Sequence, residues 1–127
     1  MIDVKQYEFD AIVVGSGITG GWAAKELTEK GLKVLVLERG RDVRHGVDYL
    51  GEHAPDWKLP FQGKPPRELY KEQYPVQSTS YAFNEATRHF FVNDQQNPYQ
   101  TDKPFHWVRA DVVGGRSLLW GRQTYRW

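Results

Sequence analysis

The sequence contains no cysteine and only one methionine. The lack of cysteine excludes disulfides, thiolate nucleophiles and cysteine-ligated metal sites. There is also no apolar run approaching the roughly 18 residues that a membrane-spanning helix requires. The formal net charge is +1, so the chain has no overall electrostatic attraction to nucleic acid or to an anionic membrane. With 127 residues, the chain has enough length for about one domain.

Other common signals of function are also absent. The four histidines (His45, His53, His89 and His106) do not show the spacing of metal ligands, so we expect no metal site. No Ser-His-Asp arrangement stands out, and the G-x-S-x-G pattern does not occur. Residues 1–10 are polar and of mixed charge, unlike a secretory signal peptide. We therefore expect a cytoplasmic protein without a membrane span.

The sequence does contain an ordered stretch from residue 10 to residue 40. It begins with an apolar run that stops at Gly15, continues with helix-forming residues that end at Gly31, and closes with a second apolar run before Glu38. The pattern predicts a strand at residues 10–14, a helix at 18–30 and a second strand at 33–37. Trp22 lies within the predicted helix, and we expect it to pack in a core or an interface.

The turn between the first strand and the helix has the spacing G-x-G-x-x-G, at residues 15–20. Gly17 lacks a Cβ, so a pyrophosphate can approach the backbone at the positive end of the helix dipole. Gly20 lets the helix lie close to the sheet. Glu38 follows Gly20 by 18 residues, where a carboxylate accepts hydrogen bonds from a ribose. This context predicts a dinucleotide site, with Arg39 near the adenine or ribose.

Residues 45–104, which we call the arm, contain all seven prolines and show no sustained periodicity. A short helix is predicted at Arg67–Gln73, with Pro66 at its start, and a strand within Gln77–Val92. About 60 residues with so little regular structure are unusual inside a compact domain, and they indicate a functional loop, a lid or an arm that packs on something else.

The final segment, residues 105–127, contains a double glycine followed by Arg116 and Ser117. Bare backbone N–H groups beside flexible turns offer a second place to hold a phosphate or a flavin edge. A tight turn with solvated arginines explains the same residues, so the segment alone leaves both interpretations open.

Taken together, the two glycine segments resemble the N-terminal part of the GMC (glucose–methanol–choline) flavin oxidoreductases. The sequence R-A-D-V-V-G-G-R-S-L-L-W-G-R, residues 109–122, is similar to that family's second glycine motif through Arg109, Gly114, Gly115, Ser117 and Gly121. The resemblance implies FAD as the cofactor. It assigns the ADP half to Gly15, Ser16, Gly17, Thr19, Gly20 and Glu38, and the riboflavin half to Val113, Gly114, Gly115, Ser117 and Trp120, with Arg109 nearby.

Two departures from the family pattern refine this interpretation. Trp120 replaces the usual Asn and Arg116 replaces a Ser, as in the branch with pyranose oxidases and bacterial sugar or polyol dehydrogenases. Pyranose oxidases attach the flavin through a His just before this Trp. Leu119 stands there instead, which implies non-covalent FAD.

The resemblance therefore implies the FAD-binding part of an enzyme that oxidises a sugar, polyol or other alcohol, with hydride transfer to flavin N5. The expected fold is α/β, a partial Rossmann-like FAD domain: a βαβ unit at 1–44, a loop-rich insertion or lid at 45–104, and a flavin-contacting segment at 105–127. The family's catalytic His is not in this chain, so we expect an N-terminal fragment that needs the rest of its fold. Some relatives are exported with a partner subunit. Two alternatives stay open, namely a stand-alone nucleotide-binding or interaction module and part of an NAD-linked Rossmann enzyme.

Overall fold

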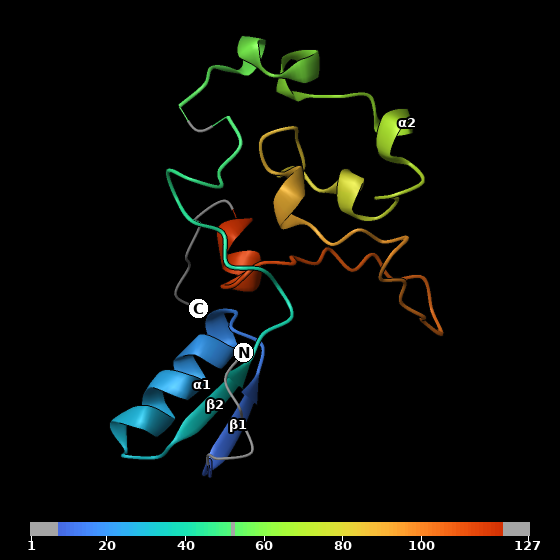
Figure 1. The fold of residues 1–127 in the computed structure, drawn as a ribbon. Helices are drawn as coiled ribbons and strands as arrows, with labels where there is room; N and C mark the ends of the chain where they lie inside the picture. Colours follow the sequence, from blue (N-terminus) through green and yellow to red (C-terminus); the bar gives the residue numbers. More distant parts are fainter. Residues whose placement is uncertain (1–7, 52, 121–127) are drawn as a thin grey trace, which may run out of the picture.

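The computed structural model describes residues 8–51 and 53–120. The lower part in Figure 1 is a βαβ unit, formed by β1 (Ala11–Val14), α1 (Ile18–Glu29) and β2 (Val34–Leu37). The upper part is the arm, whose described residues form one short helix, α2 (Arg67–Tyr70), and several 3-10 turns. The prediction of a partial Rossmann-like α/β fold is confirmed.

The two strands lie side by side and run parallel, with Ala11 opposite Val34 and Val14 opposite Leu37. Parallel strands need a crossover connection, and α1 supplies it. The helix packs closely, because a Cβ on Gly20 would lie 2.0 Å from the carbonyl oxygen of Gly15. A glycine at this position is therefore what lets α1 begin directly beside the end of β1.

The C-terminal end of α1 follows the predicted glycine signal. Gly31 has a φ of +85°, in the left-handed region that favours glycine. The Gly31 N–H donates to the carbonyl of Thr28, and the Leu32 N–H donates to that of Leu27. These bonds satisfy carbonyls at the end of the helix and turn the chain into β2.

The main core lies between the arm and the double-glycine segment rather than in the βαβ unit. Phe90, Phe91, Val112 and Leu119 form a buried cluster. In contrast, α1 has no buried residue, and Ile12 and Val14 on β1 are 62% and 82% exposed.

Trp22 is also outside any core. Its side chain is 63% exposed, and the Lys25 ammonium lies 4.9 Å from the ring centroid. Trp22 therefore does not pack in a core among the described residues, and its packing in an interface stays a prediction.

The arm departs from the prediction of a strand within residues 77–92. The chain forms 3-10 turns at Gln77–Thr79 and Arg88–Phe90, and its one ladder contact is an isolated antiparallel bridge between Phe91 and Ala110. Asn84 explains part of the difference, because its side-chain oxygen accepts hydrogen bonds from the backbone N–H groups of Ala86 and Thr87. Such local bonds compete with a sheet ladder.

The predicted helix at 67–73 is also shorter than expected. It ends at Tyr70, and a turn of three residues follows before Pro75.

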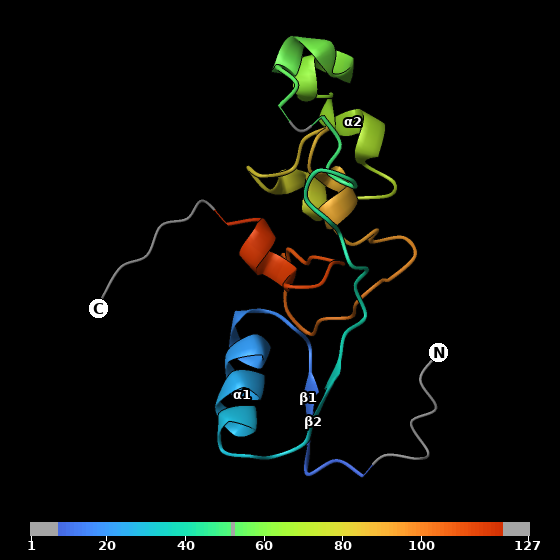
Figure 2. The same cartoon turned by 60° about the vertical axis from the view of Figure 1, so that its left-hand side comes forward.

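After crossing the arm, the chain returns to the βαβ unit just beyond the end of β2. Arg41 and Val112 form an isolated parallel bridge. A Cβ on Gly40 would lie 2.3 Å from the backbone nitrogen of Val112, so only glycine permits this approach. The following 3-10 turn, η6 (Gly115–Leu118), then lies at the N-terminal end of α1, and both views agree on this (Figures 1 and 2).

Candidate functional site

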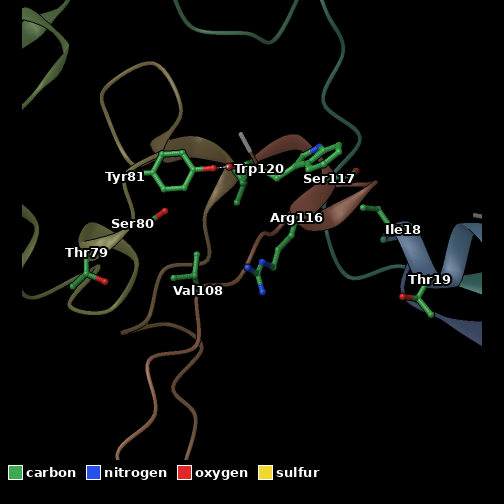
Figure 3. Close-up of a pocket in the computed structure, with 11 residues that line it drawn as sticks. Ile18, Thr19, Thr79, Ser80, Tyr81, Val108, Arg116, Ser117 and Trp120 are labelled. Atoms are coloured by element: carbon green, nitrogen blue, oxygen red, sulfur yellow. Dashed lines mark hydrogen bonds between the residues drawn. The ribbon is translucent and has the colours of Figure 1, made fainter. Parts of the chain in front are cut away.

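A cavity of about 830 Å³ lies where the βαβ unit, the arm and the double-glycine segment meet. Figure 3 shows the start of α1 on one side, the residues around Ser80 on the other, and η6 between them. The residues that line it are Gly17, Ile18, Thr19, Thr79, Ser80, Tyr81, Val108, Arg116, Ser117, Leu119 and Trp120. Its size is typical of small-molecule and cofactor sites.

The beginning of α1 offers unused hydrogen-bond donors to this cavity. Gly17 is the residue before the helix, and it provides no side chain to cap the first turn. The first backbone bond runs from the Gly21 N–H to the Gly17 carbonyl. The backbone N–H groups of Ile18, Thr19 and Gly20 have no acceptor among the described residues. Such unpaired donors at a helix start suit a phosphate group.

The second glycine segment lies directly against this loop. A Cβ on Gly115 would be 3.5 Å from the Cα of Gly17. Gly114 and Gly115 both have positive φ values, +88° and +56°. The Ser117 hydroxyl donates to the Gly114 carbonyl at 2.5 Å, which holds the turn. The structure thus brings together two segments that lie about 100 residues apart, at residues 15–20 and 114–117.

The Ser16 hydroxyl connects three parts of the chain at this site. It donates to Glu38 Oε2 at 2.6 Å and accepts from the backbone N–H of Gly114 at 2.8 Å. The backbone N–H of Ser16 donates to the same Glu38 oxygen at 2.7 Å. The glycine loop, the end of β2 and the double-glycine segment are therefore linked through one side chain.

Glu38 has a structural role that the sequence reasoning missed. Its other oxygen, Oε1, accepts from the backbone N–H of Gly40 at 2.7 Å. Burial pushes the pKa of Glu38 upward, but hydrogen bonds from the Ser16 hydroxyl and from the backbone of Gly40, Ser16 and Arg39 outweigh it. The pKa therefore lies below the ordinary value, and the group is a carboxylate at neutral pH. The prediction that Glu38 also binds a ribose stays a prediction.

The predicted site residues fall into three groups. Those that line the cavity are Gly17, Thr19, Ser117 and Trp120. Those that shape or brace the two glycine segments beside it are Gly15, Ser16, Gly20, Glu38, Gly114 and Gly115. Those that do not line it are Arg39, Arg109 and Val113. Gly121, the last residue carried over by the resemblance, lies outside the described residues.

Arg109 does not line the cavity, and its expected place near the flavin stays a prediction. The Arg109 side chain is buried and bound within the arm: Nη2 lies 3.1 Å from Asp94 Oδ1 and 2.6 Å from the Asn97 carbonyl. The guanidinium carbon lies 4.9 Å and 5.3 Å from the ring centroids of Tyr99 and Trp107. A carboxylate and two aromatic faces satisfy this cation, so it braces the arm rather than facing the cavity.

Arg39 also has a partner in the chain. Its Nε lies 3.0 Å from Asp111 Oδ1, and both side chains are largely exposed. The pair links the chain just after β2 to the returning segment, and the expected position of Arg39 near the adenine or ribose stays a prediction.

Seven residues that line the cavity were not among the predicted site residues: Ile18, Thr79, Ser80, Tyr81, Val108, Arg116 and Leu119. Thr79, Ser80 and Tyr81 belong to the arm, and the Tyr81 hydroxyl is 3.5 Å from the carbonyl of Leu119 on the opposite wall. A weak sequence signal was present, because residues 78–81 are four consecutive hydroxyl-bearing side chains. Only the fold shows that they face the glycine loop.

The described residues include neither a metal-binding cluster nor a membrane-spanning helix. They contain no group of three or more histidine, aspartate or glutamate side chains placed to hold a metal ion. Within residues 8–51 and 53–120, no helix has the length and apolarity to cross a membrane.

Comparisons with known proteins point to flavin chemistry at this site. Residues 10–48 match the family described as FAD-dependent oxidoreductases. A long-chain-alcohol oxidase of Arabidopsis thaliana is 49% identical over 53 residues, which cover 42% of this chain and 7% of the oxidase. Protein FixC of Azorhizobium caulinodans is 60% identical over 66 residues, covering 46% of this chain and 14% of FixC.

A soluble pyridine nucleotide transhydrogenase of Erwinia tasmaniensis is 32% identical over 85 residues, covering 61% of this chain and 18% of the transhydrogenase. The chain thus spans less than a fifth of the length of each of these three relatives. No solved structure shows a significant match. The matches together support an FAD-dependent oxidoreductase as the class of protein, and FAD is the cofactor that they indicate for the βαβ unit.

Proposed function

We propose that this chain forms a non-covalent FAD cradle in an oxidoreductase of the GMC type, which acts on the CH–OH group of an alcohol, sugar or polyol. The observation that carries the proposal is the meeting of the two glycine segments at one cavity, with Gly115 packed on Gly17. Many nucleotide-binding proteins have the first segment alone. The second segment, in contact with it, is what favours a flavin over a simple nicotinamide site.

The residues present fit the cofactor in chemical terms. The unpaired N–H groups at the start of α1 suit the diphosphate, and Glu38 stands at the end of β2, where the adenosine ribose is expected. Ser117 and Trp120 line the same cavity and would hold the riboflavin half. Non-covalent binding is supported by Leu119, whose hydrocarbon side chain has no group to bond to a flavin.

FAD, when bound, would supply the hydride acceptor for oxidation of the alcohol carbon, and the hydroxyl proton would pass to a base. The residues lining the described cavity include no histidine or carboxylate. The part played by this chain is therefore to bind and orient the cofactor and to exclude water from it. The alcohol substrate class is supported by the GMC resemblance and by the match to a long-chain-alcohol oxidase.

The cradle is tested with a Gly17→Val variant. No atom lies within 4 Å of a Cβ built at Gly17, and its φ is −63°, so the fold should tolerate a side chain there. The added bulk would instead occupy the space expected for the diphosphate. We expect the unaltered chain to bind FAD with a change in visible absorption, and the variant to stay folded but bind no flavin. Flavin retained by the variant would overturn the assignment.

Two further measurements separate the remaining possibilities. Acid precipitation of the flavin-loaded protein should release all flavin into the supernatant, because binding is non-covalent. A chain that takes up NADH but no flavin would favour the NAD-linked alternative instead. The reaction class is tested by alcohol- or sugar-dependent dye reduction in an oxidoreductase that carries this segment, with the Gly17→Val change as the control.

A further inference from the structure

One charged side chain, that of Arg116, lines the cavity. Arg116 is the second residue of η6, and Figure 3 shows its side chain extending between the start of α1 and the arm residues near Ser80. It is the one charged residue among those that line the cavity. Among the residues that the structure describes, no acidic side chain forms an ion pair with Arg116. Its positive charge is thus available to a ligand.

A cation beside the glycine loop would add to what the loop offers a diphosphate. The first turn of α1 consists of Ile18, Thr19, Gly20 and Gly21, so it offers backbone donors but no cation. A diphosphate carries about two negative charges, which partial charges at a helix start compensate incompletely. Arg116 follows Gly115, the residue that packs against Gly17, and it therefore enters the cavity beside the loop.

We infer that Arg116 is a diphosphate-binding residue, which supplies the positive charge that the glycine loop lacks. This inference rests on the proposed function, because it assumes that FAD occupies the cavity. It assigns Arg116 a role distinct from that of Arg109, whose charge is already neutralised by Asp94. A guanidinium is well suited to the task, since its planar N–H groups bind phosphate oxygens in pairs.

The test measures the affinity for FAD and for ADP in the unaltered chain and in the Arg116→Gln and Arg116→Lys variants. We expect Arg116→Gln to weaken both ligands by about tenfold, as for the loss of a charge-assisted contact at a partly exposed site. Arg116→Lys should recover part of the loss. The affinity of the unaltered chain should also fall more steeply with added salt than that of Arg116→Gln. Salt screens the attraction between Arg116 and the phosphates, and the variant lacks that attraction.

The matched control is Arg67→Gln, which removes the same charge from an exposed arginine in α2, outside the cavity. It should leave the affinity and the salt dependence unchanged. Equal FAD affinity in Arg116→Gln and the unaltered chain would overturn the inference while leaving the proposed function intact. If Arg116→Gln weakened the binding of FAD but not of ADP, Arg116 would contact the flavin half of the cofactor, and the inference would also be overturned. No FAD binding by the unaltered chain would overturn the proposed function itself.

Discussion

Two adjacent glycines in the first turns of α1 should respond to alanine in opposite directions. At Gly21, a Cβ would meet nothing closer than the Ser16 carbonyl oxygen at 3.7 Å, an ordinary contact. Gly21→Ala should therefore stabilise the chain by up to about 1 kcal/mol through helix propensity. At Gly20, the Cβ would lie 2.0 Å from the Gly15 carbonyl oxygen, and both groups belong to the backbone. A carbon and an oxygen need about 3.3 Å, so α1 would have to move by more than an ångström.

The expected magnitude follows from that displacement. Overpacking of this kind costs about 1–3 kcal/mol, and a backbone contact belongs at the upper end, since neither side has a flexible end. After the propensity gain is subtracted, Gly20→Ala should be destabilised by about 2 kcal/mol. The two variants should therefore differ by about 3 kcal/mol in the free energy of unfolding.

Equilibrium urea unfolding, followed by far-ultraviolet circular dichroism, measures this difference, and FAD titration gives a second readout. Moving α1 away from Gly15 also moves its unpaired N–H groups, so Gly20→Ala should bind FAD at least about tenfold more weakly, whereas Gly21→Ala should bind it normally. Equal stability of the two variants, within about 0.5 kcal/mol, would show that α1 does not approach the Gly15 turn as described.

Two other changes test the bracing of the site and the arm. Ser16→Ala removes the hydrogen bonds of the Ser16 hydroxyl to Glu38 and to the Gly114 N–H. It should lower the free energy of unfolding by about 2 kcal/mol, measured by urea titration. It should also lower the affinity for FAD, measured by FAD titration. His89 has ring nitrogens that are buried without a partner among the described residues, and burial with the nearby Arg41 charge lowers its pKa. The pKa of His89 in the folded chain is below the unfolded value of about 6.5, so the stability of the chain should fall as the pH drops below that value. His89→Gln should make stability depend less on pH. Unfolding measured at a series of pH values tests this.

Each of these two changes has a control in the same chain. Thr28→Ala removes an exposed hydroxyl that bonds only to α1 carbonyls, and it should leave FAD affinity unchanged. His106→Gln, at an exposed histidine, should keep the pH dependence of the unaltered chain. If Ser16→Ala proved no more damaging than Thr28→Ala, the three-way link through Ser16 would be unimportant. If His89→Gln kept the full pH dependence, another group would be responsible.

The βαβ unit was predictable because its signals are local. The apolar runs, the glycines at 15, 17 and 20, and the stop at Gly31 each act within a few residues, and the observed bounds differ from the predicted ones by one residue at most. The parallel pairing then follows from the single helix between two strands. The contact between Gly17 and Gly115 was expected only through the family resemblance, since nothing local specifies it.

The arm was less predictable because long-range contacts decide its structure. Residues 77–92 contain aromatic and apolar side chains suited to a strand, but Asn84 and the packing of Phe90 and Phe91 favour turns. Arg109 matched a family motif, yet Asp94 lies close enough to pair with it, and the sequence separation of 15 residues gave no sign of that. Gly40 likewise has no motif around it, although its close contact with Val112 brings the returning chain against the end of β2.

The hydrogen bond between Ser16 and Gly114 spans 98 residues, which ties the cofactor site to the folding of the whole chain. The entropic cost of closing a loop grows with the logarithm of its length and is about 4 kcal/mol here. This is several times the net stabilisation from one hydrogen bond. The contact therefore persists only when the intervening arm is folded. A ligand that contacts both glycine segments binds only this closed, folded state. The stability of the chain should therefore increase with the concentration of free ligand. Cofactor supply and folding yield should thus be coupled, and arm residues that stabilise the folded arm should contribute indirectly to cofactor affinity.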